Sequence, residues 1–428
     1  MTSGESDGQA RSTADAVARR SYGKLVAFLV AGTRDVASAE DALSEAFAAA
    51  LADWPRNGCP DNPEGWLLTA ARRKLIDFAR RRRTTEFAGG ELARLAEELE
   101  STVNEDLHIP DHRLALMFAC AHPSLDASVR APLILQVLLG LDAAMIASAF
   151  LVSPVAMSQR LVRAKDKIRQ AGIPLRIPEH EELPERLGAV LDAIYAAFAE
   201  GWADSGGTDV TRRDMAEEAL FLGQLVTQLL PDEPEALGLV ALMLHAEARR
   251  HARRNADGEY VPLAEQDMSS WNDAMIQAAE VLLLRASRRN SIGRYQLEGA
   301  LQSAHVHRRR TGEANWPSVV QLYDALWALS GSPVVALNRA LAVAEADGAA
   351  AGLELLDGVR ADARLTEYQP YWAARAELLT RTGASAAARA AYEVAIGLER
   401  DPAVRSFLQK RQSALADSSL EPVTNRGW

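Results

Sequence analysis

Apolar side chains recur every three or four positions along much of this sequence, and short clusters of helix-breaking residues separate the periodic stretches. This spacing places apolar side chains on one face of an α-helix, whereas a half-buried strand needs alternation. Alanine and leucine dominate and runs of β-branched residues are scarce, which also favours helices. The 428 residues suffice for two or three domains. The sequence therefore predicts an all-α protein of several domains.

The composition argues against secreted, membrane and enzymatic classes of protein. No apolar stretch approaches the roughly 18 residues of a membrane span, and the polar N-terminus lacks a signal-peptide core. Two cysteines cannot form a disulfide framework. The common phosphate-binding, zinc-protease and serine-hydrolase motifs do not occur. We expect a cytoplasmic protein that is not an enzyme, has no membrane partner, and needs no cofactor.

A metal site is also not expected. One candidate set can be drawn from the second hundred residues, namely His108, His112, Cys120 and His122. The spacing of Leu114, Leu116 and Phe118 between them instead indicates the start of a packed helix.

The net charge of −11 is unevenly distributed. Residues 1–178 carry 22 basic and 22 acidic side chains, so the whole acidic excess lies in the rest of the chain. Within the balanced part, residues 69–83 hold seven Lys and Arg against one Asp, and residues 160–169 hold five against one. Solvated helix faces would explain such stripes, but two cationic helices also suit the phosphates of a nucleic acid.

Breaker clusters and composition divide the chain into segments. Helices are expected over 12–30, 39–54 and 65–82, with a loop at 57–63 that is rich in Gly, Pro and Asn. The predicted domains are a helical bundle at 10–84, an acidic linker at 85–110, a second helical domain at 111–173 and a C-terminal helical domain at 183–428.

The second domain contains a candidate helix-turn-helix motif. Helices are expected over 141–150 and 154–171, and only a short turn separates them. Ser153 can cap the second helix and Pro154 suits its first position. That helix carries Arg, Lys, Ser and Gln, the residue types that read DNA in the major groove.

The C-terminal part shows weak internal repetition. Residues 372–402 fit a helix-turn-helix repeat of about 34 residues, with Gly383 at the turn and small residues where the helices would touch. Residues 333–359 are a degenerate copy. The pattern is typical of tetratricopeptide packing, which offers surfaces for a protein or peptide partner.

In this order, the motifs resemble an extracytoplasmic-function sigma factor of bacterial RNA polymerase. The resemblance rests on EDALSEAF at 40–47, WLLTAARRKLID at 66–77 and VSPVAMSQRLVRAK at 152–165. Residues 10–84 resemble sigma region 2, and residues 111–171 resemble sigma region 4. The segments IYAAFAEG at 194–201 and QDMSSW at 266–271 resemble the long C-terminal extension of one subgroup.

The resemblance implies the polymerase core and promoter DNA as partners. It implies a core-binding face on the second helix, made by Asp41, Glu45 and Phe47. It implies that the −10 element is bound by a base pocket and phosphate-holding cations, with Asn57, Asp61, Asn62, Trp66, Arg72, Arg73, Lys74 and Arg80 as candidates. Helical position suggests which residues of the recognition helix read the −35 element: Ser153, Val155, Ser158, Gln159, Arg160, Arg163 and Lys167.

Other interpretations remain open at this point. Trp66 could be a core residue, and the arginines at 80–83 could be a solvated helix end. The chain could be a helix-turn-helix regulator that binds DNA without polymerase and carries a tetratricopeptide-like sensor. It could also be a scaffold whose repeats hold a protein partner. For a sigma factor, the acidic extension would regulate activity, for example by masking the basic helices in cis.

Overall fold

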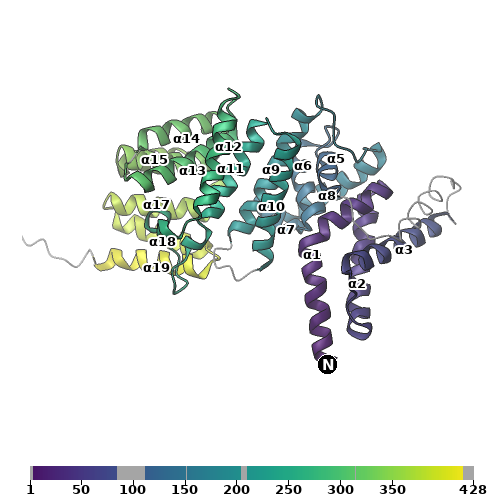
Figure 1. Ribbon diagram of the computed structural model, residues 1–428. Helices are drawn as coiled ribbons and strands as arrows, with labels where there is room; N and C mark the ends of the chain where they lie inside the picture. Colours follow the sequence, from purple (N-terminus) through teal and green to yellow (C-terminus); the bar gives the residue numbers. More distant parts are fainter. Residues whose placement is uncertain (1–2, 84–110, 151, 204–209, 314, 418–428) are drawn as a thin grey trace, which may run out of the picture. The chain divides into compact units, whose positions relative to one another are not determined.

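The computed structural model describes residues 3–83, 111–150, 152–203, 210–313 and 315–417. These residues form α-helices and short 3-10 helices without a strand, apart from one isolated bridge between Arg254 and Tyr260. The all-α prediction is confirmed. The chain divides into two compact units: residues 1–201 with 210–225, and residues 202–209 with 226–428 (Figure 1). The acidic connector predicted at 85–110 lies outside the described residues.

The first unit begins with three helices that pack on one another: α1 (Ser3–Thr33), α2 (Val36–Asn57) and α3 (Pro63–Arg83). Local chemistry sets their ends. The Asp35 carboxylate accepts a hydrogen bond from the Ser38 amide at 3.2 Å and caps α2. Gly58, with φ of 88°, ends α2 in a conformation that favours glycine. Asn62 accepts from the Gly65 amide at 2.9 Å and so supports the start of α3.

Four further helices follow in the same unit: α5 (Arg113–Cys120), α6 (Ala127–Leu139), α7 (Ala143–Ala149) and α8 (Pro154–Ala171). Asp142 caps α7 by accepting from two backbone amides at 2.8 Å. Ser153 caps α8 and Pro154 takes its first turn, as predicted. The axes of α7 and α8 differ by 109°, within the range of helix-turn-helix motifs.

Two helices of the predicted C-terminal domain belong largely to this first unit. They are α9 (Leu183–Ala203) and α10 (Val210–Leu229), of which residues up to 225 cluster with the preceding helices. The predicted domain at 183–428 is therefore divided between the two units. Side chains of α10 also pair with this unit, since Asp214 and Glu218 form ion pairs with Arg19 and Arg113.

The second unit is a succession of helices in which neighbours in sequence pack together (Figure 1). Its α-helices are α11 (Pro234–Ala248), α12 (Asp273–Ser287), α13 (Arg294–Thr311), α14 (Trp316–Ser330), α15 (Pro333–Ala346), α16 (Ala349–Gly358), α17 (Gln369–Arg381), α18 (Ser385–Leu398) and α19 (Pro402–Asp417). Short 3-10 helices lie at η1 (Arg250–Arg253), η2 (Leu263–Glu265), η3 (Met268–Ser270) and η4 (Ala363–Leu365).

Helices α17 and α18 form a hairpin with small residues at its centre. Ala376, Ala388 and Ala395 are all fully buried, so the two helices approach closely at small residues. Gly383 adopts φ of 78° in the turn between them. Trp372 lies partly buried against the same cluster. The preceding pair, α15 and α16, repeats this arrangement, with Gly352 against Ala344.

Candidate nucleic-acid interface

The outer face of α8 is the first part of the candidate interface. Met157, Leu161, Ala164 and Ile168 are buried, which fixes the orientation of the helix. The other side of the helix faces solvent and carries all the residues proposed to read the −35 element: Ser153, Val155, Ser158, Gln159, Arg160, Arg163 and Lys167. Val155 is 69% exposed and Val162 is 59% exposed. Exposed valines between polar and basic residues suit contacts with base edges and thymine methyl groups.

The remaining cations of α8 point elsewhere. Lys165 forms an ion pair with Glu40 of α2 at 2.6 Å, and Arg169 approaches Asp35 at 3.8 Å. Burial raises the pKa of Glu40, and the adjacent Lys165 offsets this only in part. The basic residues at 160–169 therefore fall into two groups. Arg160, Arg163 and Lys167 face solvent, whereas Lys165 and Arg169 contact the start of α2.

A groove of about 370 Å³ lies beside the first turns of α8. Phe150, Val152 and Met157 line it together with Arg160, and Asp192 of α9 lines its other side. An acidic residue of the predicted extension and a cation of the exposed face of α8 therefore line the same groove.

The predicted core-binding residues lie on the middle of α2. Asp41 and Glu45 are exposed, one turn apart, and Phe47 is half-buried. Glu45 pairs with Lys74 of α3 at 2.8 Å. Both of those side chains are more than two-fifths exposed, so the pair contributes little to stability and can exchange partners.

The loop between α2 and α3 carries the proposed −10 pocket residues. Asn57 donates to Asp53 at 2.7 Å, and Asp61 and Asn62 are exposed. Trp66 is half-buried, and its ring meets that of the buried Trp54 edge-on with centroids 5.5 Å apart. The Trp54 ring thus forms the core beneath Trp66, while part of Trp66 stays accessible.

The three cations Arg72, Arg73 and Lys74 differ in their surroundings. Arg72 is only 5% exposed, and its guanidinium lies over the Phe28 ring at 5.0 Å. Burial lowers the pKa of Arg72. Arg73 is exposed and Lys74 is half-exposed. In this conformation Arg73 is open to a phosphate, Lys74 pairs with Glu45 at the surface, and Arg72 packs inside the bundle. The side chain of Arg80 lies outside the described residues.

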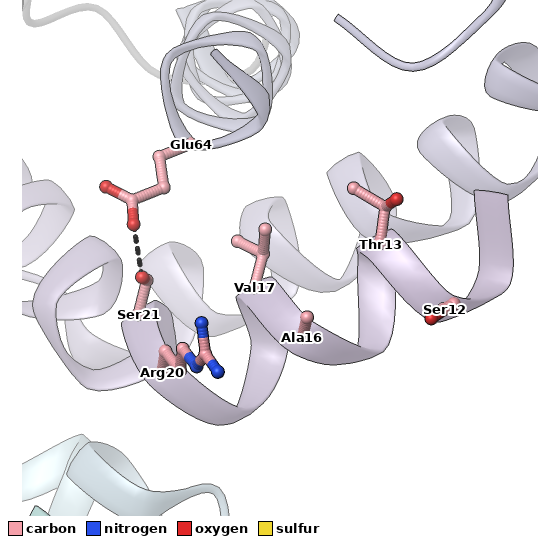
Figure 2. Close-up of a pocket in the computed structure, with 7 residues that line it drawn as sticks. All are labelled: Ser12, Thr13, Ala16, Val17, Arg20, Ser21 and Glu64. Atoms are coloured by element: carbon pink, nitrogen blue, oxygen red, sulfur yellow. Dashed lines mark hydrogen bonds between the residues drawn. The ribbon is translucent and has the colours of Figure 1, made fainter. Parts of the chain in front are cut away.

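A pocket of about 310 Å³ lies beside this loop, between α1 and the start of α3 (Figure 2). Its lining is largely polar and comes from Ser12, Thr13, Ala16, Val17, Arg20, Ser21 and Glu64. The Ser21 hydroxyl donates to the Glu64 carboxylate, and the Cys59 thiol lies 3.6 Å from the Thr13 hydroxyl. None of the residues of α1 was predicted as a site residue. Ser12 and Arg20 are exposed but Ser21 is buried, so no single polar face of α1 marks this pocket in the sequence.

Within the described ranges, no group of three His, Cys, Asp or Glu side chains is placed to hold a metal ion; His108 lies outside those ranges. In the same ranges no single helix has the length and apolar character to span a membrane. Helices α7 and α8 together reach the length and apolar composition of a membrane span, but the chain bends by 109° between them.

This arrangement defines a class of protein: a helical module with a pocket, joined to a module in which two helices meet at a short turn and the second carries an exposed polar and basic face. Comparison with known proteins places it. Residues 17–85 match the family described as sigma-70 region 2, and residues 186–287 match a family of unknown function (DUF6596). The chain belongs to the sigma-70 family, as an extracytoplasmic-function type of sigma factor with a C-terminal extension.

The relatives add similarity along nearly the full length. A protein of Rhizobium meliloti (strain 1021), described as uncharacterized, is 37% identical over 395 residues, which cover 91% of this chain and 92% of the relative. No solved structure matches the chain. The sigma-70 family consists of non-catalytic initiation factors, so a role in transcription initiation with RNA polymerase and promoter DNA follows from membership.

Proposed function

We propose that this chain directs RNA polymerase to its promoters by reading the −35 element with α8 and opening the −10 element with the module of α1 to α3. The observation that carries the proposal is the solvent-facing set of polar and basic residues on α8, at 109° to α7, in a chain whose residues 17–85 match sigma region 2. The function places the protein in the cytoplasm, where the polymerase meets the chromosome.

For the −35 element, the first turns of α8 enter the major groove. Gln159 and Arg160 are assigned to base edges, and Arg163 and Lys167 to phosphates, because phosphate contacts fix the register of a helix while base contacts specify sequence. All four side chains are exposed in the free protein.

For the −10 element, a base leaves the stack and is held by the module of α1 to α3. The polar pocket beside Glu64 offers hydroxyl, carboxylate and guanidinium groups to the edge of a base, and Arg73 and Lys74 offer cations to the single strand. Asp41, Glu45 and Phe47 bind the polymerase core, since they form an exposed acidic and apolar strip on α2.

The C-terminal extension regulates this activity. Its α9 places Asp192 at the groove that Arg160 also lines, which supports electrostatic masking of the recognition helix in cis. The hairpins of its second unit are assigned to a tetratricopeptide-like stack, and the buried small residues at 376, 388 and 395 support this assignment. A protein or peptide is the partner that such a stack suits.

Reconstituted transcription tests the proposal. Purified core polymerase and this chain are incubated with a genomic fragment library, and the transcription starts are mapped. We expect starts that share a −35 and a −10 sequence. If no specific start is found and the chain alone binds duplex operators tightly, the polymerase-independent regulator replaces this proposal.

Two double variants test which residues bind the −35 element and which open the −10 element. Gln159→Ala with Arg163→Ala should weaken initial promoter binding, and Arg73→Ala with Lys74→Ala should mainly slow opening of the −10 element. Arg389→Ala, an exposed arginine on α18 of the second unit, is the control and should change neither step. Equal effects of both double variants on initial binding would contradict the assignment.

A further inference from the structure

The two DNA-reading parts of the first unit lie close together. Lys165, in the middle of α8, contacts Glu40, and Glu40 lies on the same helix as Asn57 of the −10 loop. At 1.5 Å per residue, the helix between Glu40 and Asn57 is about 25 Å long. The recognition helix therefore crosses α2 about 25 Å from the loop.

Promoter elements are much farther apart than this. By their names, the −35 and −10 elements lie about 25 base pairs apart, which is about 85 Å of B-DNA at 3.4 Å per base pair. Bends of roughly 40–90° are accessible to DNA of this length, but closing 85 Å to 25 Å would require far more. On the proposed function, the two modules must separate before both elements are bound together.

The number of residues in the connection sets an upper limit on the separation. About 30 residues join α3 to α5, and an extended chain spans at most about 3.5 Å per residue, or roughly 100 Å in all. What resists separation must therefore be non-covalent contact between the modules.

One of these contacts is between α1 and α6. A Cβ atom built on Gly23 of α1 would overlap the carbonyl oxygen of Leu138 near the end of α6, and its nearest neighbours are all backbone atoms of Leu138. The adjacent Tyr22 packs at Gly140, the left-handed residue that ends α6. Burial is the main factor that raises the pKa of the Tyr22 hydroxyl, as expected for a side chain enclosed between two modules. The helices meet at a glycine that leaves no room for a side chain.

A helix of the extension contacts both modules. Asp214 of α10 pairs with Arg19 of α1 at 3.1 Å, and one turn later Glu218 pairs with Arg113 at the start of α5. Phe221, one further turn along, lies under the Arg113 guanidinium at 4.7 Å. Burial opposes the charge of Arg113, but Asp111 and Glu218 outweigh it and raise the pKa of Arg113. Successive turns of α10 therefore hold region 2 at one point and the helix-turn-helix module at another.

We propose that α10 is a clasp that holds the two sigma modules in a closed resting state, and that binding to the polymerase core releases it. The clasp consists of Asp214, Glu218 and Phe221, and the seam that it closes runs through Gly23 and Leu138. This inference rests on the proposed function, and it adds a conformational step: the free chain is closed and the polymerase-bound chain is open.

The test uses full-length chain with spin labels at cysteines introduced at the exposed positions Ala52 of α2 and Gln170 of α8, in a Cys59→Ser background. Cys120 is fully buried and should stay unlabelled. We expect one short label-to-label distance in the free chain and a longer one after core polymerase is added. An unchanged distance on a chain that binds core would overturn the clasp while leaving the proposed function intact.

Gly23→Ala is the wedge variant and Gly8→Ala is its matched control, because Gly8 lies on the same helix with no atom within 4 Å of an added Cβ. A closed population of 90–99% reduces apparent affinity by about 10- to 100-fold, so we expect Gly23→Ala to lengthen the label distance and bind core at least about tenfold more tightly. Gly8→Ala should change neither. A lengthened distance with unchanged core affinity would overturn the clasp.

If Gly23→Ala melts at a lower temperature than Gly8→Ala, its effect could come from lost stability. The double variant Asp214→Asn, Glu218→Gln is then used instead, because it keeps side-chain size and leaves the α1–α6 seam unchanged. It should also lengthen the distance and tighten core binding; an unchanged distance overturns the clasp. Failure of every variant, open or closed, to bind core would instead overturn the proposed function.

Discussion

Arg72 and Arg73 are adjacent arginines, but their environments predict different roles, one in stability and the other in promoter opening. Arg72 lies under the Phe28 ring and is nearly enclosed, whereas Arg73 faces solvent. Arg72→Ala should lower the free energy of unfolding by about 1–3 kcal/mol through lost packing and cation–π contact. Arg73→Ala should leave stability within about 0.5 kcal/mol and reduce promoter opening. Urea denaturation and permanganate footprinting of the −10 region measure the two effects. A stable Arg72→Ala protein with an opening defect would reverse these assignments.

Arg163 and Lys167 are assigned to phosphates, which makes a prediction about salt. Each phosphate contact contributes close to one unit to the slope of log K against log [salt], so Arg163→Ala or Lys167→Ala should each reduce that slope by about 1. Val155→Ala should weaken binding without changing the slope, because a methyl contact releases no counterion. Fluorescence anisotropy of the holoenzyme on a promoter duplex across a salt series gives the slopes. If all three variants have the same slope of log K against log [salt] as the unmodified chain, Arg163 and Lys167 do not contact phosphates.

At the scale of elements, the hairpin of α15 and α16 depends on one glycine. A Cβ atom on Gly352 would meet the Ala340 carbonyl oxygen at 2.6 Å and the Ala344 Cβ at 2.5 Å. Gly352→Ala should therefore separate the helices and destabilise the second unit by about 1–3 kcal/mol. Gly397→Ala, also within a helix but with open space around it, should be neutral or stabilising by up to about 1 kcal/mol. Thermal melts compare them, and equal melting temperatures would contradict the expected overlap.

The sequence predicted elements better than it predicted which way individual cations point. The cap at Ser153, the turn before α8 and the exposed face of that helix all follow from local pattern. Lys165 and Lys167 look alike in sequence, but Lys165 pairs with Glu40, 125 positions away. No local rule indicates such a partner. The enclosure of Arg72 by Phe28 and the pocket residues on α1 were missed for the same reason, since they depend on how helices meet.

At the scale of the whole molecule, the unit boundary predicts a difference between two truncations. A chain that ends after Leu229 keeps α9 and α10, whereas a chain that ends after residue 178 loses both helices and their contacts with Arg19 and Arg113. The longer truncation should behave like the full chain in core binding, and the shorter one should bind core several-fold more tightly. Core-binding titrations compare them, with circular dichroism as the check on folding. If both truncations increase the affinity for core polymerase equally, the inhibition comes from the second unit and not from α9 and α10.

The boundary between the units falls inside a continuous helix. Residues 210–225 of α10 cluster with the sigma modules, and its last turn, from Val226, clusters with the C-terminal unit. Phe221 lies about one turn before that junction. The side chains of the proposed clasp and the first residues of the C-terminal unit therefore belong to one uninterrupted helix. If α10 acts as the clasp, a ligand that orders or unwinds its last turn should change the affinity for core polymerase.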